Sequence, residues 1–204
     1  SIGLDVPHPK VEYVSVSDKR SSLDVDLLIV RPNISHYHLW DTGTYKGKPS
    51  LGDHQSFALK ETLSHWNKEL TEALRSGKSV FIILSALDQV YVDTGERSYS
   101  GTGRNQKTTR MVAEKNNYEM LPTSLEVISA HGEQIQRSDK APEIADFFSD
   151  FQDRMSYSVY VESKVSKPFF VSRDGTKTLG GLIRLKGVSG YIYLLPEITF
   201  EGED

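Results

Sequence analysis

Two unbroken apolar runs stand out along the chain and predict buried strands. The first covers residues 25–32 ("VDLLIVRP") and the second covers residues 79–85 ("SVFIILS"). Continuous apolar runs of this length are typical of strands that are buried on both faces, as in parallel sheets. We therefore predict two parallel strands; the first ends at Pro32, and the second is central.

Between these runs, apolar residues recur at helical spacing over residues 55–76. The apolar positions on this face are Leu59, Leu63, Trp66, Leu70 and Leu74. Asp53 suits the N-cap and Gly77 suits the C-terminal stop. Strand, helix and strand together predict a right-handed βαβ unit. Residues 33–54 are rich in Gly, Pro, Asp and Asn, which predicts a loop before the helix.

The rest of the chain predicts mostly strands. Residues 10–16 alternate in part, and residues 86–141 contain short β-like pieces with a hairpin expected about His131-Gly132. A second helix is predicted over residues 142–155, with a buried face of Ile144, Phe147, Phe148, Phe151 and Met155. Four further strand candidates follow, and residues 173–176 ("RDGT") form a turn signal between two of them.

These elements predict one α/β domain over residues 1–204. We expect a three-layer flavodoxin-like core with a mostly parallel sheet, an inserted β-rich subregion at about 86–141 and an antiparallel C-terminal extension. The hydrophobic content of 37% is ordinary for a globular chain of 204 residues and is sufficient for a core. The sequence starts at Ser1 without an initiator Met, which favours a fragment of a larger protein.

Composition narrows the function classes. The 24 basic and 28 acidic residues leave a formal charge of −4, which argues against nonspecific nucleic-acid binding by the whole surface, although a local basic patch can act alone. The chain has no cysteine, which excludes disulfides, a cysteine nucleophile and thiolate metal sites and fits a cytoplasmic setting. No apolar run approaches the ~20 residues of a membrane span, so we expect no membrane partner. No cofactor is predicted.

Ser85 ends the second apolar run, at the edge where open α/β sheets bind ligands. A nucleophilic serine needs a sharp elbow, usually G-x-S-x-G, followed by a helix. Leu84 and Ala86 flank Ser85 instead, and no helix is predicted directly after it. We interpret Ser85 as a strand end that faces a ligand, and we predict no catalytic residue.

A histidine-containing loop follows the first run as "SHYHLWD", with His36, His38 and Asp41. Two histidines beside a carboxylate suit Zn or Fe. Leu39 and Trp40 separate His38 from Asp41, which departs from the H-x-H-x-D-H signature of metallo-hydrolases. We predict a packed or ligand-contacting loop, and we keep a metal-dependent hydrolase as an alternative.

A glycine-rich basic stretch covers residues 95–110 ("GERSYSGTGRNQKTTR"). The phosphate-binding P-loop requires G-x-x-x-x-G-K-[ST], but this stretch has one residue too many between its first two glycines and no lysine after them. We predict an exposed hairpin tip that contacts a partner. Its contact residues would be Tyr99, Arg104, Lys107 and Arg110, and with Lys115 they could bind nucleic acid.

The order of parts resembles the class I glutamine amidotransferase-like superfamily and its flavodoxin-like relatives. The resemblance rests on "VDLLIVRP", on "LTEALRSGKSVFIILS" and on the closing "PFFVSRDGTKTLGGLIRLKGVSGYIYLLPE". In that superfamily the nucleophile is a cysteine, whereas this chain has Ser85-Ala86 at the corresponding place and no His-x-Glu pair near its C-terminus. The resemblance therefore implies a degenerate, noncatalytic member.

These observations favour a noncatalytic α/β domain that binds a protein partner or a small ligand, as a module of a larger intracellular protein. The expected contact residues are His36, His38, Asp41, Ser85, Tyr99, Arg104, Lys107 and Arg110. Two alternatives stay open: the metal-dependent hydrolase, and a nucleic-acid-binding module of a DNA- or RNA-processing protein.

Overall fold

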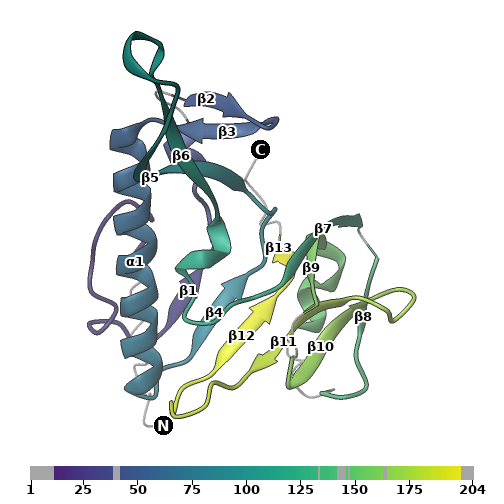
Figure 1. The fold of residues 1–204 in the computed structure, drawn as a ribbon. Helices are drawn as coiled ribbons and strands as arrows, with labels where there is room; N and C mark the ends of the chain where they lie inside the picture. The colour runs from purple at the N-terminus through teal and green to yellow at the C-terminus, as the bar shows by residue number, and fades with distance from the viewer. Residues whose placement is uncertain are drawn as a thin grey trace, which may run out of the picture.

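The computed structural model describes residues 12–38, 42–132, 134–141, 146, 148–162 and 165–198. Figure 1 shows one long helix beside a large sheet, with a small sheet at one end of the helix. The helix is α1 (Asp53–Arg75), and the 3-10 helices are η1 (Ser35–His38), η2 (Gly103–Asn105), η3 (Asn117–Met120) and η4 (Ser149–Arg154). The large sheet consists of β1 (Leu28–Val30), β4 (Val80–Ile83), β7 (Val127–Gly132), β8 (Ile135–Arg137), β9 (Met155–Val161), β10 (Lys167–Ser172), β11 (Thr178–Ile183), β12 (Ile192–Leu195) and β13 (Glu197–Ile198). The small sheet consists of β2 (Thr42–Tyr45), β3 (Lys48–Leu51), β5 (Gln89–Ser100) and β6 (Lys107–Asn116).

The large sheet is mixed, so the prediction of a three-layer flavodoxin-like α/β core with a mostly parallel sheet is wrong. Its main path runs β1-β4-β12-β11-β10-β8, and β9 pairs with β7, β11 and β13. In this sheet β1 and β12 run parallel to β4, and the other pairs are antiparallel. A three-layer core needs helices on both faces of the sheet, whereas the described residues contain a single α-helix.

The predicted parallel strand pair is confirmed, but its burial is not. Strand β1 pairs with β4 in parallel, and Ile29 lies opposite Phe81. Ile29 is 63% exposed, so β1 is not buried on both faces. On the same face Phe81 stacks on Tyr193 with ring centroids 4.7 Å apart. An apolar run alone does not distinguish a strand between two layers from a strand with one open face.

Residues 33–54, predicted as a loop, contain the β2–β3 hairpin. Its turn uses Lys46 (φ 49°) and Gly47 (φ 79°), the left-handed pair that a tight two-residue hairpin requires. Strand β3 also pairs with β5, so this hairpin and the β5–β6 hairpin form the small sheet. A glycine that predicts a loop also suits the turn of a tight hairpin.

The β-rich region at residues 86–141 is divided between the two sheets. Strands β5 and β6 belong to the small sheet, and β7 and β8 join the large one. The hairpin predicted about His131-Gly132 is wrong, because β7 pairs with β9 and β8 pairs with β10. The turn at residues 173–176 is confirmed: it joins the antiparallel strands β10 and β11, with Gly175 at φ 71°.

Helix α1 follows its predicted amphipathic pattern. Four leucines of the predicted face are 0–5% exposed, namely Leu59, Leu63, Leu70 and Leu74. Trp66 is partly buried, and its Nε1 donates a hydrogen bond to Val16 O at 2.6 Å. Gly52 is the N-cap, one residue before the predicted Asp53. Gly77 follows the helix with φ 87°, as predicted for its stop.

The core beneath α1 joins the two sheets. The α1 leucines pack in one cluster with Leu51, Val90 and Val92 of the small sheet. The same cluster includes residues of the large sheet, among them Val80, Ile82, Ile192 and Leu194. The helix therefore fixes the small sheet, with its hairpin β5–β6, against the large sheet.

Two other predicted elements differ from the structure. Residues 12–16, within the predicted strand 10–16, form no strand. Most of the first half of the predicted helix 142–155, including Ile144 and Phe147, lies outside the described residues. Its second half is the 3-10 helix η4, and Met155 begins β9.

None of the described helices is both long and apolar enough to cross a membrane.

Candidate functional site

Ser85 lies after β4, where its hydroxyl is used in a structural hydrogen bond. Ser85 Oγ donates to Pro32 O at 2.6 Å, and Ser85 is 8% exposed. Tyr118 Oη donates to Ser85 O at 2.5 Å, and burial raises the pKa of Tyr118. The phenol therefore stays protonated and remains a donor. This edge of the sheet is closed around the Ser85 side chain.

Asn117 completes the same network. Its Nδ2 donates to Pro32 O and to Ala86 O, each at 3.0 Å, and its Oδ1 accepts from Asp88 N at 3.1 Å. Asn117 is 1% exposed. The segments after β1 and β4 thus converge, but η3 fills the space between them. No local sequence pattern predicts that η3 occupies this space, because Asn117 is remote from both strands along the chain.

The histidine loop is only partly described. His36 is exposed, and its ring packs edge-on against the ring of Tyr37, with the ring centroids 5.7 Å apart. Tyr37 is buried, and its hydroxyl shares a hydrogen bond with Thr62 Oγ1 at 2.6 Å. The His38 side chain and Asp41 lie outside the described residues. Within the described part of the chain, no group of three His, Asp or Glu residues is placed to hold a metal ion. A metal at His36, His38 and Asp41 stays a prediction.

The β5–β6 hairpin projects beyond the body of the molecule (Figure 1). Its outer part carries Tyr99, which is 64% exposed, together with exposed Arg104 and Lys107. Neither of these two basic side chains forms an ion pair with any described residue. The structure confirms the predicted exposed hairpin tip, while the predicted contact role of these residues stays a prediction.

Arg110 lies at the base of the hairpin and is held there. Its Nη2 donates to Ser50 Oγ at 3.0 Å and to Leu51 O at 2.7 Å. Its guanidinium also lies 3.6 Å from Asp53 Oδ1 and 3.4 Å from Asp93 Oδ2. Arg110 therefore anchors the hairpin to the start of α1 and is less accessible to a partner than Arg104 or Lys107.

Two acids and two arginines form this anchor, which we call the hairpin clamp (Asp53, Asp93, Arg97 and Arg110). Arg97 Nη1 donates to Asp93 Oδ1 at 2.9 Å, and Gly95 N donates to the same oxygen at 2.6 Å. Asp93 is 5% exposed. Its burial alone raises the pKa, but the hydrogen bonds from Gly95 and Arg97 outweigh burial and lower the pKa to about 2. Asp93 is therefore ionised at neutral pH.

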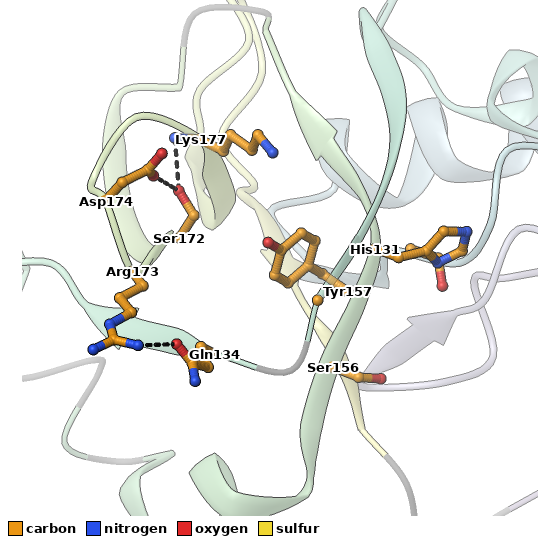
Figure 2. A pocket seen from close by; sticks show the side chains of 10 residues that line it. His131, Gln134, Ser156, Tyr157, Ser172, Arg173, Asp174 and Lys177 are labelled. Carbon is orange, nitrogen blue, oxygen red and sulfur yellow. Dashed lines mark hydrogen bonds between the residues drawn. The ribbon is translucent and has the colours of Figure 1, made fainter.

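An open polar cleft of about 1000 Å³ lies elsewhere, between β9 and the turn that joins β10 to β11 (Figure 2). Figure 2 shows Tyr157 between this turn and His131, with Arg173 hydrogen-bonded to Gln134. The residues that line the cleft are His131, Gly132, Gln134, Ser156, Tyr157, Ser158, Ser172, Arg173, Asp174 and Lys177. The sequence predicts the turn but not the cleft, because β7, β9 and the turn meet only in the folded chain.

Comparison with known proteins identifies no relative: no family model, no curated protein and no solved structure matches the chain. The resemblance to the glutamine amidotransferase-like superfamily gains no support from these searches.

Proposed function

We propose that this chain is a noncatalytic domain that binds a protein partner through the β5–β6 hairpin. The observation that carries the proposal is the combination of an exposed tip and a rigid base. Tyr99, Arg104 and Lys107 are exposed, while the hairpin clamp holds the base in one orientation. A preorganised hairpin loses less conformational entropy on binding than a mobile loop does.

Strand β6 has a second edge that pairs with no strand of the described residues, which supports a protein as the partner. The small sheet has the order β2-β3-β5-β6, so β6 is an edge strand of ten residues. An edge strand of this length can accept a strand from another protein through main-chain hydrogen bonds. Met111 on β6 is 44% exposed and supplies an apolar contact beside the basic tip.

Nucleic-acid binding is the second candidate, and the ion pairs disfavour it. Of the four basic residues in the predicted cluster, Arg110 is held by the hairpin clamp, and Lys115 Nζ lies 2.6 Å from Glu119 Oε2. Only Arg104 and Lys107 remain for phosphate contacts among those four. Affinity for nucleic acid rises with the number of phosphates that the protein neutralises. Because only two cations of the cluster are available for phosphates, a protein partner is favoured over nucleic acid. The absence of cysteine is compatible with a cytoplasmic setting for this binding.

A site-specific photo-cross-linker tests the proposal. Placed at Thr108 on β6 in the full chain and activated in extract of the producing cells, it should yield one discrete protein adduct. Tyr99→Ala combined with Arg104→Ala should reduce that adduct at least about tenfold, because interface hot spots are enriched in tyrosine and arginine. Lys68→Ala, which changes an exposed lysine on α1, is the matched control and should leave the adduct unchanged.

The same experiment separates the alternatives. A cross-linker at exposed Ser189 should not yield the Thr108 adduct, because Ser189 lies in the loop before β12. Equal adducts from the two positions, or an adduct that survives the double substitution, would refute the proposal. An adduct that nuclease removes would instead support nucleic-acid binding.

A further inference from the structure

The turn that forms one wall of the polar cleft is held by its own hydrogen bonds. Ser172 N donates to Lys177 O at 3.0 Å, and Lys177 N donates to Ser172 Oγ at 3.0 Å. Asp174 Oδ1 accepts from Thr176 N at 3.1 Å and from Ser172 Oγ at 2.5 Å. These bonds hold the main chain on both sides of Arg173 and Lys177, so the two cationic side chains extend from a preorganised turn.

Neither cation forms an ion pair with a described acid, although the opposite charge of Lys177 helps to lower the pKa of Asp174. Arg173 Nη1 donates to Gln134 Oε1 at 2.8 Å, which orients the guanidinium without neutralising it. Lys177 Nζ lies 5.5 Å from the ring centroid of Tyr160, with no carboxylate in ion-pair range. Asp174 is the acid nearest in sequence, and its Oδ1 is occupied by donors of the turn.

Tyr157 supplies a third donor at the opposite wall. Figure 2 shows its ring in the cleft with the hydroxyl directed toward the turn. The phenol rests on Gly132: a Cβ added to Gly132 would lie 2.4 Å from Tyr157 Oη. The hydroxyl forms no hydrogen bond with any other described residue. A glycine at position 132 is therefore needed for the phenol to occupy this place.

We propose that this cleft binds a small molecule that carries a phosphate or carboxylate group, with Arg173 and Lys177 as its cationic contacts and Tyr157 Oη as a neutral donor. Guanidinium and ammonium donors bind oxyanions through charge-assisted hydrogen bonds, and the cleft has room for a metabolite-sized ligand. This inference is independent of the hairpin proposal, since the two sites share no residue.

Titration of the full chain with pyrophosphate and, separately, with citrate tests the proposal by amide chemical shifts at low ionic strength. We expect saturable shifts centred on residues 172–177 and on Tyr157, and the tighter of the two probes indicates which oxyanion is preferred. Arg173→Gln and Lys177→Gln should each weaken binding about tenfold, as expected for loss of one charged hydrogen bond. Gly132→Ala should weaken it without a change of charge, because Tyr157 must move.

Lys186→Ala is the matched control, since Lys186 is exposed in the β11–β12 loop. The affinity of this variant for each probe should equal that of the unsubstituted chain. The amide spectrum of each variant reports whether it is folded. Should either cleft substitution unfold the chain, the shifts of the unsubstituted protein still decide. No saturable shifts with either probe, shifts centred away from the cleft, or equal weakening by Lys186→Ala would overturn the proposal.

Discussion

Gly190 lies where the chain enters β12 and touches the end of α1. Its N–H donates to Leu74 O at 2.8 Å, and an added Cβ would lie 2.1 Å from Lys78 O and 2.9 Å from Leu74 Cα. Main-chain atoms form these contacts, so no side chain can rotate away to make room. We predict that Gly190→Ala lowers the free energy of unfolding by at least about 2 kcal/mol, measured by urea denaturation.

Gly43→Ala is the control for this prediction. A Cβ at Gly43 would have Ser50 O as its nearest neighbour at 3.8 Å, an ordinary contact. We expect a change within about 0.5 kcal/mol for this surface substitution. Equal urea midpoints for the two variants would show that the close approach at Gly190 does not limit stability.

At the scale of an element, the hairpin clamp makes the attachment of β5–β6 depend on pH. The pKa of Asp93 is lowered from 3.8 to about 2 in the folded chain. Ionised Asp93 therefore stabilises the fold above about pH 4, and this contribution of about 2 kcal/mol is lost as the pH falls toward about 2. Asp93→Asn should lower the free energy of unfolding at pH 7, and its difference from the unsubstituted chain should shrink on acidification.

Glu96→Gln is the matched substitution for Asp93→Asn, because it removes one negative charge from an exposed position of the same hairpin. We expect it to change stability by less than about 0.5 kcal/mol at any pH between 2 and 7. The measurement is urea unfolding of the three proteins across this pH range. A constant gap between Asp93→Asn and the unsubstituted chain would contradict the prediction.

At the scale of the whole molecule, the shared core under α1 predicts that both sheets unfold together. Leu70 is 0% exposed and belongs to the cluster that contains Val92 of β5 and Leu194 of β12. We predict that Leu70→Ala lowers the free energy of unfolding by about 2–5 kcal/mol. Hydrogen exchange should then show equal losses of amide protection in β5 and β12.

Met111→Ala is the comparison for the shared core, because Met111 is exposed on β6. It should leave amide protection in both sheets nearly unchanged. Protection lost in β5 but retained in β12 after Leu70→Ala would mean that the small sheet opens by itself, and the single cooperative core would be wrong.

Local patterns predicted the elements that depend on local chemistry. The 3.6-residue spacing located the buried face of α1, and the "RDGT" turn located the β10–β11 connection. Sequence also placed Tyr99, Arg104 and Lys107 at an exposed hairpin tip. Arg110 belonged to the same pattern, yet its partner Asp53 lies far away along the chain, outside the hairpin. No short window of sequence could show that this arginine is engaged.

The sequence by itself determined where helix α1 lies, that the two apolar runs contain strands, and that the chain contains no cysteine chemistry. The predicted βαβ unit accounts for the parallel β1–β4 pair, but only the tertiary structure decided how the other strands pair. It also decided that η3 closes the edge at Ser85 and that β9 and the β10–β11 turn form the polar cleft. These features depend on contacts between residues that are distant in the chain, and such contacts arise from the packing of the whole fold.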